Sequence, residues 1–365
     1  MKKNVIIFIP SIEDGGVEKN LYEVSNYLVK NNISLEIITC NKNMSFKFSK
    51  DIKFIGTKNS YWNNRSRYIK YIICLLILFL TLIKRKEKTL VFAFQANIYA
   101  VILAKILNVK IITRSNSAPP GWSQNAIKNF IYKFFIKFAN DVMVNSFEFK
   151  KIFEKKFNIK VKCIYNPFNK NFVLKKIKIK KKITFFKKGY LNIISVGRLT
   201  DQKDHLTLLR SIKELDSNFK VKVIIIGKGS TKDILKRYII KNNLQNKIKL
   251  FGYTNNPFPF IQKANMVVLT SKFEGLPNIL LEAQFLRKYI ISTNCPTGPK
   301  EILLNSKAGD LINIGDFKKL SHLIKNYSNN KNSIIKKINI GYKKFYRFDY
   351  MLNCKKYLNF IKNNY

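Results

Sequence analysis

FEGLPNILLE, residues 273–282, puts two carboxylates eight residues apart at the point where a buried strand meets a helix. The preceding run Met266–Thr270 is apolar and predicts a short strand, which a glycine then breaks. Pro277 suits the first turn of a helix, where its missing N–H is not needed. Glu274 is therefore expected on the loop and Glu282 on the helix, from where they can bind different parts of one ligand. A helix-start acid and a solvated helix acid would give the same pattern, so this stretch alone leaves both interpretations open.

A second stretch, IISVGRLTDQKDH at residues 193–205, has two cations directly after a predicted strand at 191–196. Arg198 can bind a phosphate through two parallel hydrogen bonds, and Lys203 can add a point charge. Ligands of open α/β sheets bind outside the carboxyl ends of the strands. The pair therefore predicts an anion site, although a chain with 68 Lys and Arg residues can hold such a pair by chance.

The order of these and two further motifs resembles the retaining glycosyltransferases of the GT-B fold, the "glycosyl transferases group 1" or GT4 family. The resemblance covers nearly the whole chain, and the Glu-x7-Glu stretch is its most specific part. STNCPTGPKEIL, residues 292–303, resembles the branch that adds hexoses or N-acetylhexosamines to lipid-linked glycans of the bacterial surface. The motifs are Gly15-Gly16-Val17-Glu18, Val196-Gly197-Arg198 with Lys203, Ile226-Gly227-Lys228-Gly229, and Glu274 with Glu282.

The resemblance implies three catalytic residues. Arg198 and Lys203 would neutralise the charge that develops on a departing diphosphate, and Glu274 would contact the hydroxyls of the donor sugar. Many transferases hold the diphosphate with a metal bound by Asp-x-Asp, and this sequence contains no Asp-x-Asp. We therefore expect no metal and no cofactor, with the nucleotide diphosphate sugar as co-substrate.

The resemblance also implies a substrate-binding set. Glu282 would accept hydrogen bonds from the ribose, and Gly15 and Gly16 would let the first loop approach the donor closely. Gly229 would border the base or the ribose, and Asn278 belongs to the same set. Plain turns account for the glycines as well, because glycine is frequent wherever a chain turns sharply.

The chain departs from the family pattern at two places. Many members carry a His in the first domain, whereas the corresponding stretch here, 113–117, has none. The chain holds only His205 and His322, both expected to be structural, so no general base is assigned and the departing phosphate can itself take the acceptor proton. After Glu282 the usual small-Gly-x-Pro turn is replaced by Gln284–Lys288.

The charge balance is extreme, with 68 basic and 21 acidic residues and a formal net charge of +47. Such a chain is attracted to anionic lipid, polyphosphate or nucleic acid. It carries no signature of a nucleic-acid-binding module, and its lysines are not focused on one element, so we expect no nucleic-acid partner. The five cysteines contain no Cys-x-x-Cys pair, which disfavours a zinc site and suits reduced thiols in the cytoplasm.

One apolar run could meet a membrane. Tyr71–Ile83 is shorter than the roughly 20 residues needed to span a bilayer, and basic residues flank it. The run fits a helix lying on a membrane surface and equally a buried packing helix. With the Phe/Lys alternation of 129–138, it predicts peripheral association with the inner face of the cell membrane. Residues 1–10 do not have the pattern of a signal peptide and predict a first buried strand.

The alternation of strands and helices predicts an α/β fold with parallel sheets. The resemblance implies a GT-B arrangement, in which two Rossmann-like domains face each other across a cleft and a C-terminal helix crosses back. The expected divisions are an acceptor-side domain at 1–168, a Lys-rich linker at 169–189 with room for a short exposed strand, a nucleotide-sugar-binding domain at 190–345, and the returning helix at 346–365.

The sequence thus predicts a retaining transferase that moves a hexose or N-acetylhexosamine from a nucleotide diphosphate sugar, foremost a UDP-sugar. The acceptor would be a lipid-linked glycan or polysaccharide in surface glycan synthesis. Another GT-B enzyme, such as a sugar-nucleotide epimerase or a phosphorylase, is the alternative, and a basic nucleic-acid-binding protein is a more distant one. An epimerase of this fold needs acid and base residues that the motifs do not supply.

Overall fold

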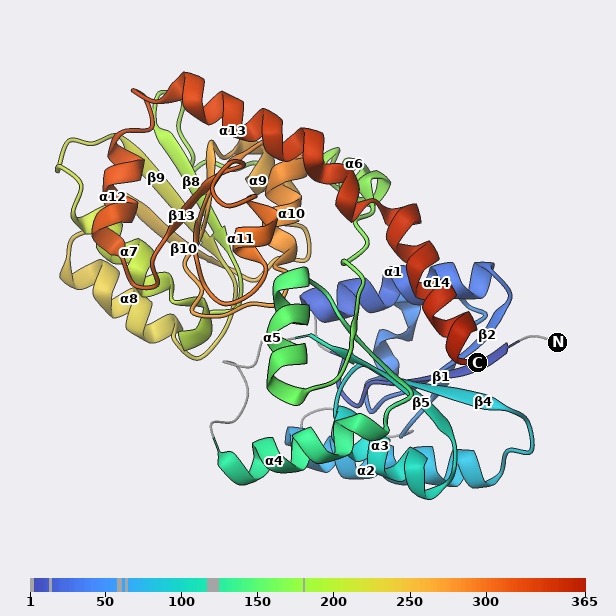
Figure 1. The fold of residues 1–365 in the computed structure, drawn as a ribbon. Helices are drawn as coiled ribbons and strands as arrows, with labels where there is room; N and C mark the ends of the chain where they lie inside the picture. Colours follow the sequence, from blue (N-terminus) through green and yellow to red (C-terminus); the bar gives the residue numbers. More distant parts are fainter. Residues whose placement is uncertain (1–2, 13–14, 58–60, 63–64, 117–124, 180) are drawn as a thin grey trace. The chain divides into compact units, whose positions relative to one another are not determined.

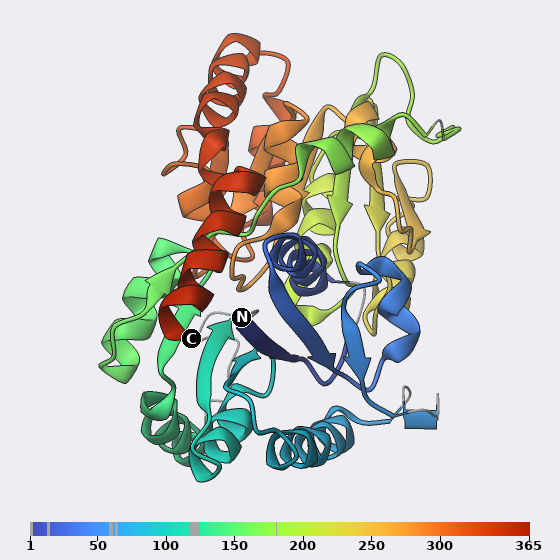
Figure 2. The ribbon, with the colours of Figure 1, turned by 90° about the vertical axis from the view of Figure 1, so that its right-hand side faces the viewer.

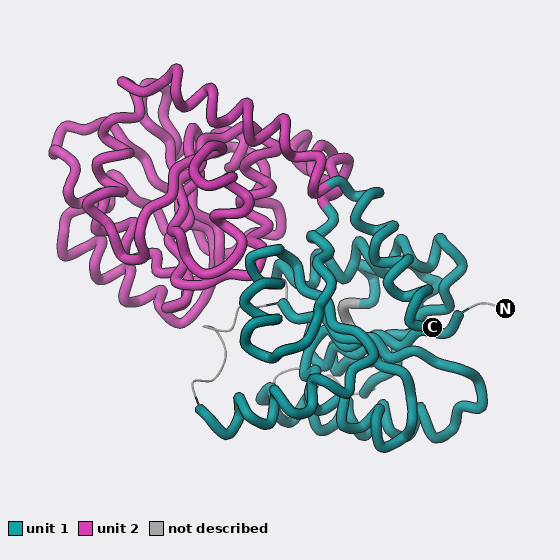
Figure 3. Tube along the Cα trace, viewed as in Figure 1, with its two compact units in different colours: residues 1–167, 349–365 teal, residues 168–348 magenta. Residues whose placement is uncertain are grey.

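The computed structural model describes residues 3–12, 15–57, 61–62, 65–116, 125–179 and 181–365. The chain forms two compact units, each an α/β domain around its own parallel sheet (Figure 3). Unit 1 comprises residues 1–167 and 349–365, and unit 2 comprises residues 168–348. The predicted α/β class is confirmed.

Unit 1 is built on a seven-stranded parallel sheet with the order β3-β2-β1-β4-β5-β6-β7. Helices α2, α3 and α4 cover one face of this sheet, and α1 and α14 cover the other (Figures 1 and 2). The strands are β1 (Lys3–Phe8), β2 (Ile33–Ile38), β3 (Lys53–Ile55), β4 (Thr89–Ala93), β5 (Lys110–Ser115), β6 (Asp141–Val144) and β7 (Lys162–Cys163). The helices are α1 (Gly16–Lys30), α2 (Arg67–Ile83), α3 (Asn97–Ile106), α4 (Ala126–Phe135), α5 (Phe147–Phe157) and α14 (Tyr350–Asn364), with short 3-10 turns η1 (Lys42–Lys47) and η4 (Ile136–Phe138).

Unit 2 is built on a six-stranded parallel sheet with the order β10-β9-β8-β11-β12-β13. Its strands are β8 (Leu191–Val196), β9 (Val221–Ile226), β10 (Ile248–Gly252), β11 (Met266–Leu269), β12 (Tyr289–Thr293) and β13 (Asp310–Ile312). Its helices are α6 (Lys170–Ile177), α7 (His205–Lys213), α8 (Lys232–Lys241), α9 (Phe258–Lys263), α10 (Asn278–Phe285), α11 (Pro299–Ile302), α12 (Phe317–Lys325) and α13 (Lys331–Lys343), with turns η5 (Asp201–Lys203) and η6 (Lys344–Phe348).

Runs of β-branched residues form the strands because both faces of each sheet are covered by helices. In β9, for example, Val223 and Ile225 lie in one core cluster, and the intervening Ile224 is equally buried. Continuous apolar runs of this kind are typical of parallel sheets. Polar residues mark the ends of the elements. Ser146 is the N-cap of α5, and its hydroxyl accepts a hydrogen bond from the Phe149 amide at 3.2 Å.

The C-terminal helix belongs to the first unit, as predicted. Helix α14 packs on α1, and its Tyr357 and Phe360 rings lie 6.5 and 6.3 Å from the Phe92 ring of β4. Asp349 caps the helix by accepting a hydrogen bond from the Leu352 amide at 3.1 Å. The last segment of the chain thus completes the core of the domain formed by the first segment.

The Lys-rich segment 169–189 differs from the expected linker. It lies in unit 2 and begins with α6, which is capped by the Asn169 side chain through a 3.0 Å bond from the Phe172 amide. Phe172 packs against Phe258 of α9, and Val173 is buried. No strand forms in the described part of this segment. Phe172 and Val173 attach this segment to unit 2, although its Lys-rich composition predicted a linker.

Helix α2, which contains the apolar run Tyr71–Ile83, has one buried face and one exposed apolar face. Cys74, Leu78 and Leu82 form a buried stripe with a spacing of four residues, whereas Leu76 and Leu80 are exposed. The helix therefore packs on the sheet with one face and leaves an apolar face uncovered. Among the described residues, no helix is both long enough and apolar enough to cross a bilayer.

Candidate active site

The predicted catalytic residues lie at the switch point of the second sheet. The chain runs from β8 outward through β9 and β10, then returns to place β11 on the other side of β8. Arg198 follows β8, and Glu274 follows β11, so the two loops leave neighbouring strands at the same edge. Such a reversal in strand order opens a crevice in which α/β proteins bind ligands.

Glu274 and Lys203 form a buried ion pair at this edge. The Lys203 Nζ lies 2.5 Å from the Glu274 Oε1, and the two side chains are 14% and 8% exposed. The Ser271 hydroxyl donates a second hydrogen bond to the same oxygen at 2.6 Å. An ammonium group has three donors, so Lys203 can hold Glu274 and an anionic ligand together. The sequence indicated both residues but neither their pairing nor the part played by Ser271.

Gln202 joins the two loops that carry the pair. The side-chain amide of Gln202 donates a hydrogen bond to the Phe273 carbonyl at 2.9 Å. The backbone carbonyl of Gln202 accepts a hydrogen bond from the Lys272 backbone amide at 2.8 Å. Its side-chain oxygen accepts a 3.3 Å bond from Arg198, whose side chain is otherwise exposed. Gln202 is not among the predicted site residues, and its place between Arg198 and Lys203 is the signal that the sequence offers for it.

A third loop braces Glu274 from the other side. The Thr297 hydroxyl donates to the Glu274 carbonyl at 2.5 Å, and the Glu274 amide donates to the Pro296 carbonyl at 3.3 Å. Gly298 has a φ of +86°, and a Cβ there would lie 2.3 Å from the Gly275 oxygen. The stretch 292–303 was singled out only by resemblance, and its contacts give it a physical role in positioning Glu274.

Helix α10 presents its amino end to the same region. It begins at Asn278, which is half-buried, after Pro277 at the N-cap position. Glu282 lies within the helix and is 5% exposed. The first backbone N–H groups of a helix and its dipole favour an anion at this end. Arg198, Lys203, Glu274, Asn278 and Glu282 thus all belong to one edge of unit 2.

Close backbone packing explains why residues 227 and 229 of unit 2 are glycines. A Cβ at Gly227 would lie 1.9 Å from the Gly197 oxygen, and one at Gly229 would lie 2.2 Å from the Leu199 oxygen. The loop after β9 therefore packs backbone against backbone on the loop that carries Arg198. The Leu199 amide also donates to the Lys228 carbonyl at 2.9 Å.

Gly15 and Gly16 lie in unit 1, at the switch point between β1 and β4. Gly15 is the N-cap residue of α1, and Gly16 is its first residue. A Cβ on Gly15 would lie 2.7 Å from a carboxylate oxygen of Glu18, which is buried in α1. These two glycines and the residues of unit 2 therefore occupy equivalent edges of two different sheets.

His205 is buried beneath the loop that carries Arg198. Its Nδ1 lies 3.2 Å from the Ser195 hydroxyl, and burial, reinforced by the charge of Lys203, lowers the pKa of His205 to about 4. The imidazole is therefore neutral near pH 7. His322 lies on the exposed side of α12. Among the described residues, no group of three or more His, Cys, Asp or Glu side chains is arranged to hold a metal ion.

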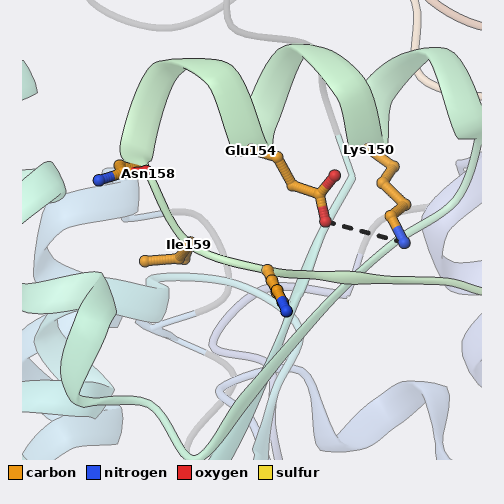
Figure 4. A pocket seen from close by; sticks show the side chains of 5 residues that line it. Lys150, Glu154, Asn158 and Ile159 are labelled. Atoms are coloured by element: carbon orange, nitrogen blue, oxygen red, sulfur yellow. Dashed lines mark ion pairs between the residues drawn. The ribbon is translucent and has the colours of Figure 1, made fainter.

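A pocket on unit 1 lies beside α5 (Figure 4). Within it, the Lys150 Nζ lies 3.7 Å from the Glu154 Oε1, and that oxygen also accepts the Val161 amide at 2.9 Å. The Glu154 carboxylate is therefore already bound by Lys150 and by the Val161 amide, so we assign the pocket no catalytic role. The lining residues are Lys150, Glu154, Asn158, Ile159 and Lys160.

Part of the chain matches a known protein family. The sequence model of the family "Glycosyl transferases group 1" matches residues 176–344, which include the whole edge described above. A glycosyltransferase of Methanocaldococcus jannaschii is 39% identical over 178 residues, which is 47% of this chain and 44% of that relative. The match therefore spans less than half of the archaeal protein.

A longer match is a Campylobacter jejuni enzyme named N-acetylgalactosamine-N,N'-diacetylbacillosaminyl-diphospho-undecaprenol 4-alpha-N-acetylgalactosaminyltransferase. It is 25% identical over 339 residues, covering 84% of this chain and 85% of the relative. Anabaena HepE in complex with UDP has a TM-score of 0.79 at 16% identity, covering 99% of this chain and all of HepE. A Rickettsia africae glycosyltransferase has a TM-score of 0.81 at 19% identity, covering 100% and 98%.

The fold is the GT-B fold of these solved glycosyltransferases. Residues 176–344, just under half of the chain, match the glycosyl transferases group 1 family, as the motifs predicted.

Proposed function

We propose that this protein is a retaining glycosyltransferase of surface glycan synthesis. It transfers a hexose or N-acetylhexosamine from a UDP-sugar to a lipid-linked or polysaccharide acceptor. The observation that carries the proposal is the buried Lys203–Glu274 pair beside Arg198 at the β8/β11 edge. Two Campylobacter jejuni relatives, named as acting on undecaprenyl-diphosphate-linked glycans, support the acceptor class. HepE, solved with UDP, supports the nucleotide.

The residues at this edge supply what the reaction requires. As the bond between the sugar and the diphosphate breaks, negative charge develops on the leaving group, and fixed positive groups stabilise it. Arg198, Lys203 and the amino end of α10 carry that positive charge in our proposal. The second oxygen of Glu274 is the group available to the sugar hydroxyls, and Glu282 is assigned to the ribose.

The proposed step forms the new glycosidic bond on the face from which the diphosphate leaves. The acceptor hydroxyl loses its proton to a phosphate oxygen of that leaving group, so no protein base is required. No Asp-x-Asp occurs in the sequence, and we propose that Arg198 and Lys203 carry out the charge neutralisation without a metal.

Three rival functions predict different results in an assay. A sugar-nucleotide epimerase would convert a UDP-sugar without any acceptor, and a phosphorylase would require inorganic phosphate. A nucleic-acid-binding protein would retain DNA or RNA at moderate salt. The family match over residues 176–344 favours the transferase over all three.

The test is an assay of the purified chain with a panel of nucleotide sugars and a lipid-diphosphate-linked acceptor in EDTA. We expect acceptor-dependent release of UDP, and Arg198→Ala should lower turnover roughly 10²–10³-fold. Conversion of donor without acceptor would contradict the transferase proposal, and a strict need for added manganese or magnesium would contradict the metal-independent part.

We also propose that unit 1 docks on the inner face of the cell membrane through α2 and α4. The observation behind this is an uncovered apolar face on the outer helices of the first sheet. On α2, Ile72, Leu76 and Leu80 are 60%, 58% and 55% exposed. On α4, Ile127 and Phe130 are both 70% exposed. The two helices lie on either side of α3 on the same face of the sheet (Figures 1 and 2).

The charges around this face favour an anionic bilayer over a second copy of the chain. Neither α2 nor α4 contains an acidic residue. Exposed Arg67 and Lys84 stand at the ends of α2, and Lys128 and Lys133 stand on α4. Two copies would bring these cations together, whereas a bilayer with anionic headgroups accepts both the cations and the apolar side chains.

Flotation with anionic and neutral liposomes at low and high salt tests the docking. We expect stronger binding to anionic vesicles, weakening with salt because the charges are screened, with a salt-resistant remainder from the apolar side chains. Leu76→Ser with Phe130→Ser should remove that remainder, whereas the control Ile234→Ser with Ile240→Ser changes exposed residues of α8 in unit 2. Equal effects of the two pairs would contradict the assignment.

A further inference from the structure

Cys40 and Cys74 bring two thiols together although they lie on different elements of unit 1. Cys40 follows β2 at the carboxyl edge of the sheet, and Cys74 lies on the buried stripe of α2. Their sulfur atoms are 3.5 Å apart, and the side chains are 2% and 0% exposed. A disulfide requires the two sulfurs to approach to about 2.0 Å.

The surroundings make the two thiols unequal. The pKa of Cys40 is lowered, chiefly by its hydrogen bond with the Cys74 thiol and further by the charge of Lys70, while burial acts against both. The same hydrogen bond and burial raise the pKa of Cys74. Lys70 is itself buried at 8% exposure, one helical turn before Cys74. If Cys40 is oxidised to a sulfenic acid, the neighbouring thiol can condense with it to a disulfide.

We propose that Cys40 and Cys74 are a redox-modification site that forms a reversible disulfide with a hydroperoxide as oxidant. The Cys40 thiolate attacks the peroxide, releases one hydroxide or alkoxide, and becomes a sulfenic acid. The Cys74 sulfur then attacks the Cys40 sulfur, loses its proton, and expels the hydroxyl oxygen as water. Two thiols lose two electrons, and the peroxide bond gains them.

The bond would tie α2 to the edge of the sheet near the Gly15-Gly16 loop. Asn41 directly follows Cys40, and its side-chain oxygen accepts a hydrogen bond from the Ile12 amide at 3.0 Å. A shift of Cys40 toward α2 would thereby reach Ile12. The disulfide would also restrict the movement of α2, the helix that exposes Leu76 and Leu80. This effect does not depend on which sugar the protein transfers.

The test is non-reducing peptide mapping of the full chain after treatment with hydrogen peroxide. We expect loss of two of the five free thiols, a Cys40–Cys74 linked peptide lighter by the mass of two hydrogens, and full reversal by dithiothreitol. Oxidation should be slow, because both thiols become accessible only when α2 opens locally. Cys40→Ala and Cys74→Ala should each abolish the linked peptide.

Cys163→Ala is the matched control, since Cys163 is the more exposed thiol of unit 1 and has no role in the pair. This variant should form the linked peptide like the wild type. A folded wild-type protein that yields no linked peptide after prolonged oxidation overturns the proposal. Bonds that join other cysteines, or oxidation confined to Cys163, overturn it as well.

Discussion

At the scale of single residues, the site depends on one carboxylate oxygen that accepts hydrogen bonds from two side chains. Lys203 and Ser271 both donate to the Glu274 Oε1, in surroundings where neither member of the ion pair is more than 14% exposed. Removing one partner of a buried pair leaves an uncompensated charge, which costs more than the pair itself contributes. Lys203 therefore has a structural role besides its proposed catalytic one.

Lys203→Ala should lower both turnover and stability. We expect a turnover loss of roughly 10²–10³-fold and a decrease of about 3 kcal/mol in the unfolding free energy, because Glu274 would keep only Ser271. Urea unfolding of the purified variant measures the second quantity. Lys272→Ala is the control, since its pair with Asp201 is 39% and 87% exposed and should contribute less than about 1 kcal/mol. Equal stability of the two variants would show that the buried pair has no structural role.

His205 should make unit 2 less stable in mild acid. Its pKa is lowered from 6.5 to about 4 in the folded protein, so between these values the unfolded state binds the proton more readily. Stability is therefore full above pH 6.5 and falls as the pH drops toward 4, by up to about 3 kcal/mol. Unfolding free energies of the wild type and His205→Asn across this range measure the effect. The variant should lose less, and the exposed His322→Gln control should lose as much as the wild type.

At the scale of elements, the catalytic loops are held by backbone contacts that a side chain would obstruct. The loop after β9 packs on the loop after β8, and the loop after β12 packs on the loop after β11. For the first pair of loops, the resemblance placed Gly229 at the border of the base or ribose and left a plain turn open, because a glycine-rich turn gives no sign of which backbone it will meet. Gly298 stands out in the sequence only through the family resemblance of residues 292–303. Its contact with Gly275 could not be predicted, because the two residues lie 23 positions apart.

Gly298→Ala tests this contact against a matched control. Gly298 and Gly252 both have a φ of +86°, so alanine should cost about 1–3 kcal/mol of backbone strain at either position. Only at Gly298 would the new Cβ meet backbone, at 2.3 Å from the Gly275 oxygen, whereas Gly252 has nothing within 4 Å. We expect Gly298→Ala to lose stability and turnover beyond the control, because Glu274 is displaced. Similar activities of the two variants would separate Gly298 from the site.

At the scale of the whole molecule, the alternation of apolar strands and helices was enough to predict two parallel α/β sheets. Edge strands β3 and β13 were missed because three residues are too few to establish a pattern. Helix α6 was missed because lysines dominate its segment, and its attachment depends on tertiary contacts of Phe172 and Val173. The uncovered face of α2 could not be predicted either, since an almost uniformly apolar run does not reveal which side will be buried.

The stereochemistry of the product tests directly whether the protein is a retaining transferase. With a UDP-sugar donor, whose sugar–phosphate bond is α, and a lipid-diphosphate-linked acceptor in EDTA, NMR of the isolated product reports the configuration of the new bond. Our account predicts an α-glycosidic linkage, made at full rate by the wild type and roughly 10²–10³-fold more slowly by Lys203→Ala. A β-linked product would contradict retention and, with it, the assignment of the departing diphosphate as the group that takes the acceptor proton.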